Sequence, residues 1–352
     1  MPEAPVSRRA APIGGFLGLE WPGAGHGGLR RHWQLPGMAQ AHVSARAAFK
    51  ALLDALPECQ VWLPAYLCPE FSSVVPRARR RFYPIDATLT PKVGFLQGEA
   101  LPGDLVFAVD YFGRPPGVEF REYAVATTAV WFVEDCAQAM ETGQAAWGDW
   151  QLYSPRKLVG VADGGILVAR SERARALRLA DAPATGFAEA VALVRERLAR
   201  FEDIDEGDNE QWYALHREKE ARMEAAGGRI SRLSWELLGV LDPAAIGAAR
   251  RRNFAYLARR LGAFALLPEV QPDFVPLGFP VRVPAWRRAA VRERLFQERI
   301  FAATHWECLP SPAPEFPAEH ALAASVLTLP CDQRYSPEHM ERVAAVFERA
   351  MR

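Results

Sequence analysis

The stretch WFVEDCAQAMETGQAAWGDWQLYSPRKLVGVADGGILVA, residues Trp131–Ala169, decides the fold. Its first apolar run ends in Asp135, its second run, DWQLYS, leads to Lys157, and the pair Gly164–Gly165 opens a third run, GGILVA. Continuous apolar runs of this kind are typical of strands that are buried on both faces of a largely parallel sheet. An acid therefore ends one expected strand, and a lysine follows the next.

Apolar runs and helix-periodic stretches alternate along most of the chain. The expected strands are 60–64, 80–86, 104–113, 129–135, 149–154, 164–169, 274–283 and 325–330. The expected helices are 44–56, with Ser44 as the N-cap, 171–180, 187–201, 231–241, 246–264, 284–299 and 337–351. We therefore expect a loose tail at 1–11, an α/β large domain with a mainly parallel sheet at 12–244, and a smaller C-terminal α+β domain at 245–352.

The bulk composition excludes several classes of protein. The 352 residues include 42 Lys+Arg and 42 Asp+Glu, so the zero formal charge predicts neither a nucleic-acid nor a membrane partner. The five cysteines form no CxxC pair, and the histidines lack the i, i+4 spacing of a helical metal site, so we expect neither a disulfide framework nor a metal. The sequence shows no signal peptide and no run of about 20 apolar residues, which favours the cytoplasm.

The acid and the lysine together suit pyridoxal phosphate (PLP) as a cofactor. PLP needs a lysine amine to form an imine, here Lys157, and a carboxylate against its pyridine nitrogen, here Asp135. Ser154 lies three residues before the lysine, where its hydroxyl can reach the phosphate. Taken singly, an Asp at a strand end is more often a cap, such a lysine is usually solvated, and a Gly–Gly pair is usually a turn. Their order and spacing are what indicate the cofactor.

In this order and spacing the sequence resembles the DegT/StrS-type nucleotide-sugar aminotransferases, which have PLP fold type I, the aspartate aminotransferase-like fold. The family's EDAAQ/H motif appears as EDCAQ (134–138), its GD…SF…K segment as GDWQLYSPRK (148–157) and its GEGG segment as ADGG (162–165). The resemblance implies that Asp135 pairs with the pyridine nitrogen and that Gln138 contacts the 3-oxygen side of the ring. It also implies that Ser154 binds the phosphate and that Lys157 carries PLP as a Schiff base.

The resemblance extends over about residues 40–350. The family's phosphate-binding SGTAAL appears as SARAAF (44–49), which implies phosphate contacts from Ser44, Ala45 and Arg46 at a helix N-terminus. A plain capped helix is compatible with the same residues. Ala45 and Arg46 replace the usual Gly and Thr, and the arginine can bind phosphate through its charge.

Three further positions of the resemblance carry aromatic or imidazole side chains. The family's vPsyT segment appears as LPAYLC (63–68), in which Cys68 replaces the usual ring-stacking aromatic and leaves Tyr66 to cover the cofactor. His305 and Trp306 fall where the family approaches its substrate, and Trp306 offers a flat apolar face to a sugar or base. A simply packed aromatic is an equal alternative for Trp306.

The family's GyNyRm segment, which reaches the neighbour's cofactor across the dimer, is absent. GGRISRLSW (227–235) stands in its place, with Arg229, Ser231 and Arg232 as candidate substitutes. We expect a homodimer in which a basic group from 227–253 approaches the partner's cofactor. These departures indicate a divergent branch of the family.

The resemblance implies a PLP-dependent aminotransferase that moves an amino group from a glutamate-like donor to a nucleotide-linked keto-sugar, in polysaccharide, glycoconjugate or secondary-metabolite biosynthesis. Lys157 would also act as the general base, and the family's dehydratase branch has histidine there. Two alternatives stay open. One is another fold type I reaction, such as a lyase or a transfer to a non-sugar ketone, and the other is a non-catalytic PLP-binding regulatory protein.

Overall fold

The computed structural model describes residues 11–21, 28–33, 38–140, 146–202, 210–225, 227–267 and 275–352. Residues 1–10 of the expected tail lie outside this part of the chain. The strands are β1 (Ile13–Gly14), β2 (Ala39–His42), β3 (Val61–Pro64), β4 (Arg80–Tyr83), β5 (Leu105–Val109), β6 (Trp131–Cys136), β7 (Trp150–Tyr153), β8 (Gly165–Ala169), β9 (Phe279–Arg282), β10 (Ile300–Phe301) and β11 (Val326–Leu329).

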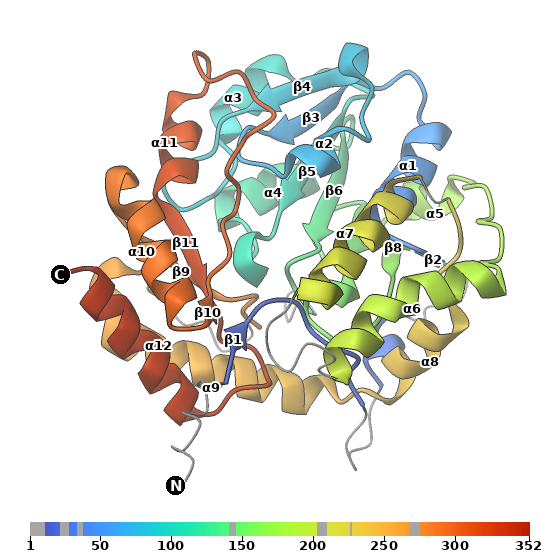
Figure 1. Cartoon of the computed structure of the whole chain (residues 1–352). Helices are drawn as coiled ribbons and strands as arrows, with labels where there is room; N and C mark the ends of the chain where they lie inside the picture. The colour runs from blue at the N-terminus through green and yellow to red at the C-terminus, as the bar shows by residue number, and fades with distance from the viewer. Residues whose placement is uncertain are drawn as a thin grey trace, which may run out of the picture.

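Helices connect these strands and fill the second half of the chain (Figure 1). They are α1 (Ala45–Ala55), α2 (Pro69–Ser72), α3 (Val93–Glu99), α4 (Val118–Ala126), α5 (Glu172–Ala176), α6 (Phe187–Phe201), α7 (Glu210–Ala225), α8 (Arg232–Val240), α9 (Pro243–Leu261), α10 (Ala285–Gln297), α11 (Pro317–Ser325) and α12 (Pro337–Ala350). Short 3₁₀ turns are η1 (Leu29–His32), η2 (Arg77–Arg79), η3 (Tyr111–Gly113), η4 (Pro155–Lys157) and η5 (Gly262–Phe264). No described helix is long and apolar enough to span a membrane.

A seven-stranded sheet in the order β2-β8-β7-β6-β5-β3-β4 forms the centre of the large part of the molecule. Strands β7, β6, β5, β3 and β4 pair in parallel, whereas β8 is antiparallel to both of its neighbours. The carboxyl ends of β2, β3, β5, β6 and β7 therefore meet at one edge, and β8 begins there. This is the α/β fold class expected from the sequence.

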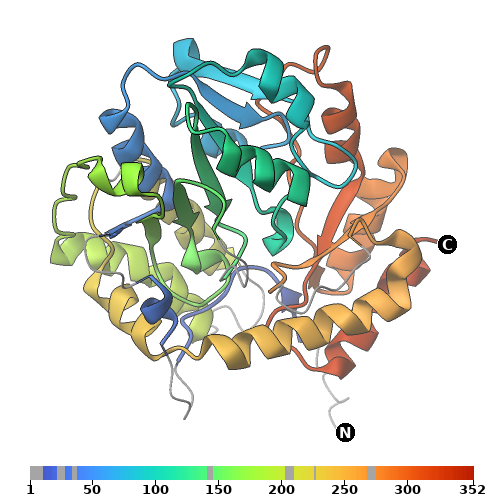
Figure 2. The same cartoon turned by 180° about the vertical axis from the view of Figure 1, so that it is seen from behind.

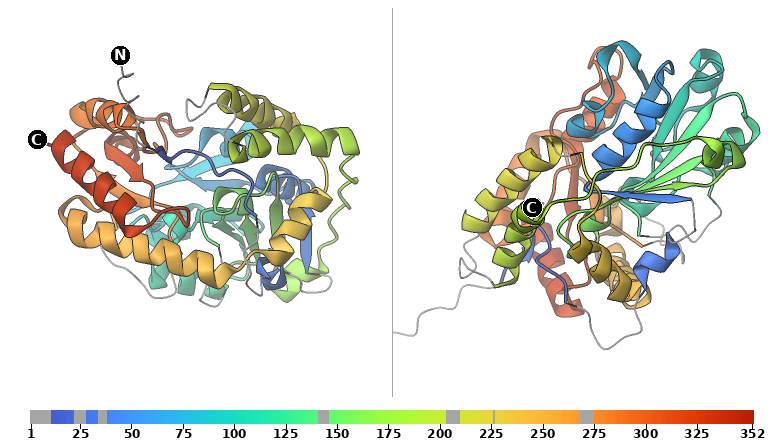
Figure 3. Two further views of the ribbon diagram at one scale, coloured as in Figure 1. Left: turned by 60° about the horizontal axis from the view of Figure 1, so that its bottom comes forward. Right: turned by 90° about the vertical axis from the view of Figure 1, so that its right-hand side faces the viewer.

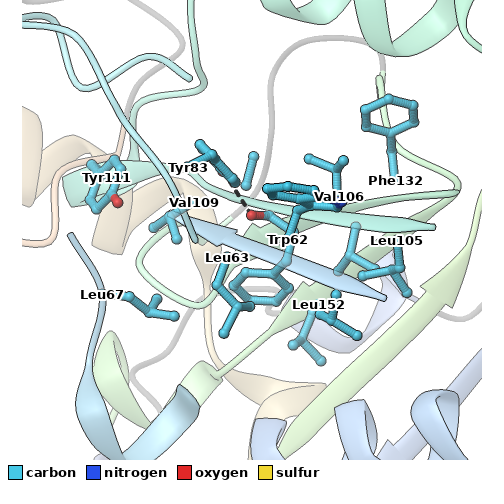
Figure 4. Close-up of a cluster of buried hydrophobic side chains, with 14 of the residues drawn as sticks. Trp62, Leu63, Leu67, Tyr83, Leu105, Val106, Val109, Tyr111, Phe132 and Leu152 are labelled. Atoms are coloured by element: carbon cyan, nitrogen blue, oxygen red, sulfur yellow. Dashed lines mark hydrogen bonds between the residues drawn. The ribbon is translucent and has the colours of Figure 1, made fainter. Parts of the chain in front are cut away.

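Apolar side chains fill the space between the sheet and its helices, and α1 and α4 lie over opposite faces (Figures 1 and 2). Leu63, Val106 and Phe132 are almost fully buried in this core (Figure 4), and burying such a side chain stabilises the fold by about 1.5–3 kcal/mol. Two larger aromatic residues in this core form hydrogen bonds through their polar atoms. Tyr83 Oη donates to the Phe107 carbonyl over 2.8 Å, and Trp62 Nε1 donates to a carboxylate at 2.9 Å.

A second core lies at the C-terminal side of the molecule. It packs α9, α10 and α12 around the antiparallel pair β9–β11 and the parallel pair β1–β10. Helix α9 runs along the foot of the molecule between the two parts (Figures 2 and 3), and Phe254 and Leu257 on this helix enter the second core. Ile13, from the other end of the sequence, is also fully buried there.

Every strand and helix expected from the sequence is present, although some are shorter. The helix expected over 171–180 is only Glu172–Ala176, and the strand expected over 274–283 is only Phe279–Arg282, with residue 274 outside the described ranges. The sequence did not indicate α2, α3, α4, α7, α11, β1, β2 or β10. The large and small domain limits, 12–244 and 245–352, stay an expectation.

Candidate active site

The residues expected to bind a cofactor come together at the carboxyl edge of the sheet. Ser44 follows β2, Tyr66 follows β3, Asp135 lies near the end of β6, and Lys157 ends the turn η4 after β7. Strands β6 and β7 are parallel neighbours, with Asp135 opposite Leu152 in the register. The topology thus brings together side chains that are more than 100 residues apart in the sequence.

Asp135 is a buried carboxylate whose charge is only partly compensated. Its Oδ1 accepts a hydrogen bond from the Ala137 N–H at 2.9 Å. Burial raises the pKa of Asp135 to about 6, and the nearby positive charge of Lys157 opposes that rise. A carboxylate in this setting favours a cationic partner.

Lys157 is exposed at the end of η4, and its backbone N–H donates to the Ser154 carbonyl over 3.1 Å. Ser154 itself is buried. The turn is fixed from behind by Arg197 of α6, whose Nη2 donates to the Arg156 carbonyl over 3.0 Å and whose Nη1 donates to the Leu17 carbonyl. Arg197 therefore fixes the backbone of η4, from which the Lys157 side chain extends.

The N-terminus of α1 faces the same edge. Ser44 caps the helix, since its Oγ accepts the Ala47 N–H at 3.1 Å. Gly164, with φ of 136°, donates its N–H to the Val43 carbonyl over 2.9 Å. A Cβ on Gly165 would lie 2.0 Å from the Ser44 carbonyl carbon, so only glycine allows β8 to begin this close to the helix cap.

Two arginines lie beside this helix end. Arg46, in the first turn of α1, and Arg156, in η4, both face Glu220 of α7. The Glu220 carboxylate is 2.9 Å from Arg156 Nη1 and 3.6 Å from Arg46 Nη2. Arg156 and Glu220 were not among the site residues expected from the sequence.

Tyr66, His305 and Trp306 form an aromatic wall at the site. Tyr66 is fully buried, its hydroxyl donates to the His305 carbonyl, and its ring meets Trp306 edge-on with centroids 5.2 Å apart. The Tyr111 hydroxyl in turn donates to the Tyr66 carbonyl. Trp306 is half-buried, so one part of its ring packs and another part stays accessible.

The His305 side chain is held in a neutral state. Its Nδ1 lies 2.8 Å from Thr328 Oγ1 of β11. Desolvation of the ring, together with the positive charge of Lys157, lowers the pKa of His305 to about 4. The C-terminal segment thereby supplies an uncharged imidazole to the site.

Gln138 is buried just beyond β6 and supports a neighbouring loop. Its Oε1 accepts the Phe112 N–H at 2.7 Å, and Phe112 has a positive φ of 58°. Gly113 also has a positive φ, 94°, and a Cβ there would lie 2.5 Å from the Val275 carbonyl oxygen. One side of the Gln138 amide is therefore used to position the 110–113 turn.

Of the candidates for a contact across a dimer, Ser231 is used within its own chain. Its N–H and Oγ donate to the Asp163 carboxylate at 2.7 and 2.6 Å, and the Ser234 hydroxyl donates there as well. Both donors of Ser231 are used within the chain, where they fix the Gly164 turn, so its contact across a dimer stays a prediction. Arg229 and Arg232 are exposed.

A buried acidic group lies next to the site. Asp110, Glu134 and Cys136 offer ligand atoms that all lie within 4.8 Å of one another. Burial raises the pKa of Glu134 to about 7 and that of Asp110 well above its usual value, with each carboxylate close to the other. Gln151 Nε2 donates to Glu134 over 2.8 Å. The neutral, protonated form of such a pair is favoured in the interior.

No protein-family model and no curated protein sequence matches the chain. Solved structures do match. DesV from S. venezuelae, solved with a ketimine intermediate, is 19% identical, with a TM-score of 0.63 over 92% of this chain and 87% of that one. The putative sugar aminotransferase Spr1654 from Streptococcus pneumoniae, in its PLP form, is 14% identical, with a TM-score of 0.66 over 97% and 100%.

A DegT DnrJ EryC1 StrS aminotransferase from Brucella abortus is also similar, at 15% identity and a TM-score of 0.60 over 89% of this chain and 86% of that one. The agreement spans both cores and includes the mainly parallel seven-stranded sheet. The chain therefore has PLP fold type I, the fold of the DegT/StrS-type sugar aminotransferases.

Proposed function

We propose that this chain is a PLP-dependent aminotransferase that moves an amino group from a glutamate-like donor to a keto-sugar. The observation that carries the proposal is the meeting of Asp135 and Lys157 at the carboxyl edge of the sheet, close enough for the lysine charge to act on the carboxylate. Open α/β sheets bind their ligands at this edge. The aminotransferases with this fold support the same conclusion.

The residues present fit PLP in two ways. Asp135 is a buried carboxylate with a raised pKa, and a protonated pyridine nitrogen is a cation of the kind that such a carboxylate needs. At the other end, Arg46 Nη2 and Arg156 Nε are buried and make no hydrogen bond among the described residues. Orphaned guanidinium donors beside a helix N-terminus suit a phosphate dianion.

The chain's own residues have distinct tasks in this proposal. Ser44, Ala45, Arg46 and Ser154 hold the phosphate, and Asp135 keeps the pyridine nitrogen protonated. When bound, PLP supplies the electron sink that makes amino transfer possible.

Lys157 provides the amine for covalent attachment and then moves a proton to and from the reacting carbon as the general base. Gln138 supports the side of the ring that carries the 3-oxygen. Tyr66 is proposed to cover a face of the ring, since it is the aromatic residue that follows β3 at this edge of the sheet.

The acceptor is proposed to be a nucleotide-linked keto-sugar that approaches along His305 and Trp306. The neutral imidazole can hydrogen-bond a sugar hydroxyl without adding charge, and the accessible part of Trp306 offers an apolar face for the ring or base. Sugar aminotransferases among the structures with this fold favour this class of acceptor. The product would enter polysaccharide, glycoconjugate or secondary-metabolite biosynthesis in the cytoplasm.

We also propose a homodimer in which Arg229 or Arg232 approaches the partner's cofactor. Both side chains are exposed on a segment that is tied to the Gly164 turn, so they are presented from a fixed backbone. Sedimentation velocity should show a dimer at assay concentrations, and an active monomer would overturn this part of the proposal.

The central test is attachment of the cofactor to Lys157. Borohydride reduction of the loaded protein followed by peptide mapping should find the label on Lys157 in the wild type and none in Lys157→Ala. The control is Lys50→Ala, because Lys50 lies on the exposed face of α1, where it pairs with Asp54 at 2.8 Å. A labelled lysine peptide from Lys157→Ala would contradict the assignment.

The acceptor class is tested by competition. The enzyme is converted to its amine form with glutamate, then offered nucleotide-linked 4-keto and 3-keto sugars beside simple 2-keto acids. Return of the starting absorbance with a keto-sugar supports the proposal. A return only with 2-keto acids unrelated to the donor would remove the sugar and leave the PLP assignment in place.

A further inference from the structure

Glu220 of α7 reaches Arg46, which we assign to the phosphate, and Arg156, whose unpaired Nε suits the same anion. Its Oε1 lies 2.9 Å from Arg156 Nη1, and its Oε2 accepts from Arg156 Nη2 at 3.2 Å and lies 3.6 Å from Arg46 Nη2. In Figure 1 the α7 helix crosses in front of α1, which is the helix whose first turn carries Arg46. One carboxylate from a different part of the chain thus bridges two separate pieces of the site.

This carboxylate satisfies the arginines incompletely. Arg46 Nη2 stays without a hydrogen bond, and so does Arg156 Nε, although these atoms are buried. The arginine side chains are only 15% and 14% exposed, so water compensates them poorly. A buried donor without a partner costs about 1–3 kcal/mol, so an anion with more oxygens and more charge than a carboxylate is favoured at this position.

The surroundings carry an excess of positive charge. Besides Arg46 and Arg156, Arg197 and Lys219 are buried here, although burial lowers the pKa of Lys219 to about 7. The acidic groups that face these side chains are Glu196 and Glu220, so the three arginines alone outnumber them. The positive charges of Arg156, Lys219, His216 and Arg46 together lower the pKa of Glu220 despite its burial. Glu220 is therefore ionised at neutral pH and competes as an anion.

We propose that Glu220 is an intramolecular competitor for the cofactor phosphate: it holds Arg46 and Arg156 before the cofactor binds, and the phosphate displaces it. The inference rests on the proposed function, which places the phosphate at Ser44, Arg46 and Ser154. Two anions beside the same pair of arginines repel each other, so each bound phosphate requires Glu220 to give up its contacts.

Displacement also affects how α7 holds the lysine turn. Lys219, the residue before Glu220, is paired with Glu196 of α6, and the adjacent Arg197 donates to the Arg156 carbonyl. Glu220 is the direct link from α7 to the Arg156 side chain, and phosphate entry releases it. The remaining link through Arg197 keeps the backbone of η4 in place, and Lys219 keeps α7 paired with α6.

The test measures ligand binding to the cofactor-free chain rather than turnover. Glu220→Gln keeps the size of the side chain and removes its charge, and Glu220→Ala removes both. Glu218→Gln is the matched control, because Glu218 lies on the same helix and pairs only with the exposed Arg222 in the described structure, at 3.0 Å. The ligands are PLP, pyridoxal without the phosphate, and inorganic phosphate.

We expect Glu220→Gln to bind PLP about tenfold more tightly than the wild type, which corresponds to ~1.4 kcal/mol, and to bind inorganic phosphate more tightly as well. Pyridoxal should bind all variants equally, and Glu218→Gln should match the wild type. Hydrogen exchange in α7 should rise when inorganic phosphate is added to the wild type, but not in Glu220→Ala.

Weaker binding of PLP and phosphate by the Glu220 variants would contradict the inference. If Glu220 only orients Arg46 and Arg156 from behind, both substitutions will weaken PLP and phosphate binding, which overturns the inference; equal affinities overturn it too. A failure of PLP to bind any variant would instead contradict the proposed function, and the inorganic phosphate series would still decide whether Glu220 competes.

Discussion

Replacing Asp135 by Asn should stabilise the cofactor-free chain while it weakens the cofactor's hold. The asparagine Oδ1 can still accept the Ala137 N–H, but it carries no charge into the interior. The folded-state pKa of Asp135 is about 6 and its ordinary value is 3.8. Since one pKa unit corresponds to ~1.4 kcal/mol, the ionised carboxylate costs the folded chain about 3 kcal/mol.

The pH dependence follows from the direction of the shift. Below the ordinary pKa, aspartic acid is neutral in both the folded and the unfolded chain and costs nothing. As the pH rises toward the folded-state pKa, only the unfolded chain ionises freely, so the folded wild type loses stability. The advantage of Asp135→Asn should therefore grow from about 1 kcal/mol at pH 4.5 to about 3 kcal/mol at pH 8.

Urea unfolding of the two cofactor-free proteins across this pH range measures the difference directly. Glu134→Gln is the control, because its carboxylate is equally buried and has a pKa of about 7 but lies in the acidic group with Asp110. Glu134→Gln should also gain stability at high pH and bind PLP as the wild type does, whereas Asp135→Asn should retain only some PLP and lose most turnover. A pH-independent difference for Asp135→Asn, or equal loss of PLP in both variants, would refute this reasoning.

Three further predictions test the surroundings of the site. Gly165→Ala should abolish folding or PLP binding, because its Cβ would lie 2.0 Å from the Ser44 carbonyl carbon. The control Gly98→Ala, whose Cβ would have nothing within 4 Å, should stabilise α3 by about 1 kcal/mol. Thermal unfolding compares the two variants, and a Gly165→Ala variant as stable as the wild type would contradict the close approach. The half-buried His305 should titrate near pH 4 by NMR because desolvation and the positive charge of Lys157 disfavour its protonated form, and a midpoint near 6.5 would contradict this environment. Asp163→Ala should lower the free energy of unfolding in urea by about 3 kcal/mol, since the Ser231 and Ser234 donors lose their acceptor. A decrease below about 1 kcal/mol would show that water replaces the carboxylate as the acceptor.

The sequence predicted most of the parallel sheet because β3, β5, β6 and β7 are almost entirely buried and consist of largely apolar runs, whereas the edge strand β4 is partly exposed. It also predicted the N-cap of α1, where Ser44 and the periodic stretch after it are local signals. Strand β2, Ala39–His42, was not indicated, since its residues are only half-buried and mostly unsuited to a strand. Its conformation comes from pairing with β8, more than 120 residues away in the sequence, which no local pattern encodes.

Helix α7 shows a different reason for failure. Its buried stripe has regular helical spacing, but two of the four positions are His216 and Lys219, between Trp212 and Met223. Because two of these buried positions are polar, the sequence lacks the helical spacing of apolar residues that predicts an amphipathic helix. The abundance of Glu, Ala and Arg favours a helix only by intrinsic propensity. Because α7 was not foreseen, its contribution to the site, Glu220, could not be foreseen either.

The second core sets an order on folding during synthesis. Ile13 and Gly14 are synthesised before the central sheet, yet they pair with Ile300 and Phe301, more than 280 residues later in the sequence. Strands β2 to β8, between Ala39 and Ala169, can assemble while the rest of the chain is still being translated. Strand β1 can therefore pair only after Ile300 and Phe301 have been made, so Ile13 stays without its partner strand while the central sheet assembles.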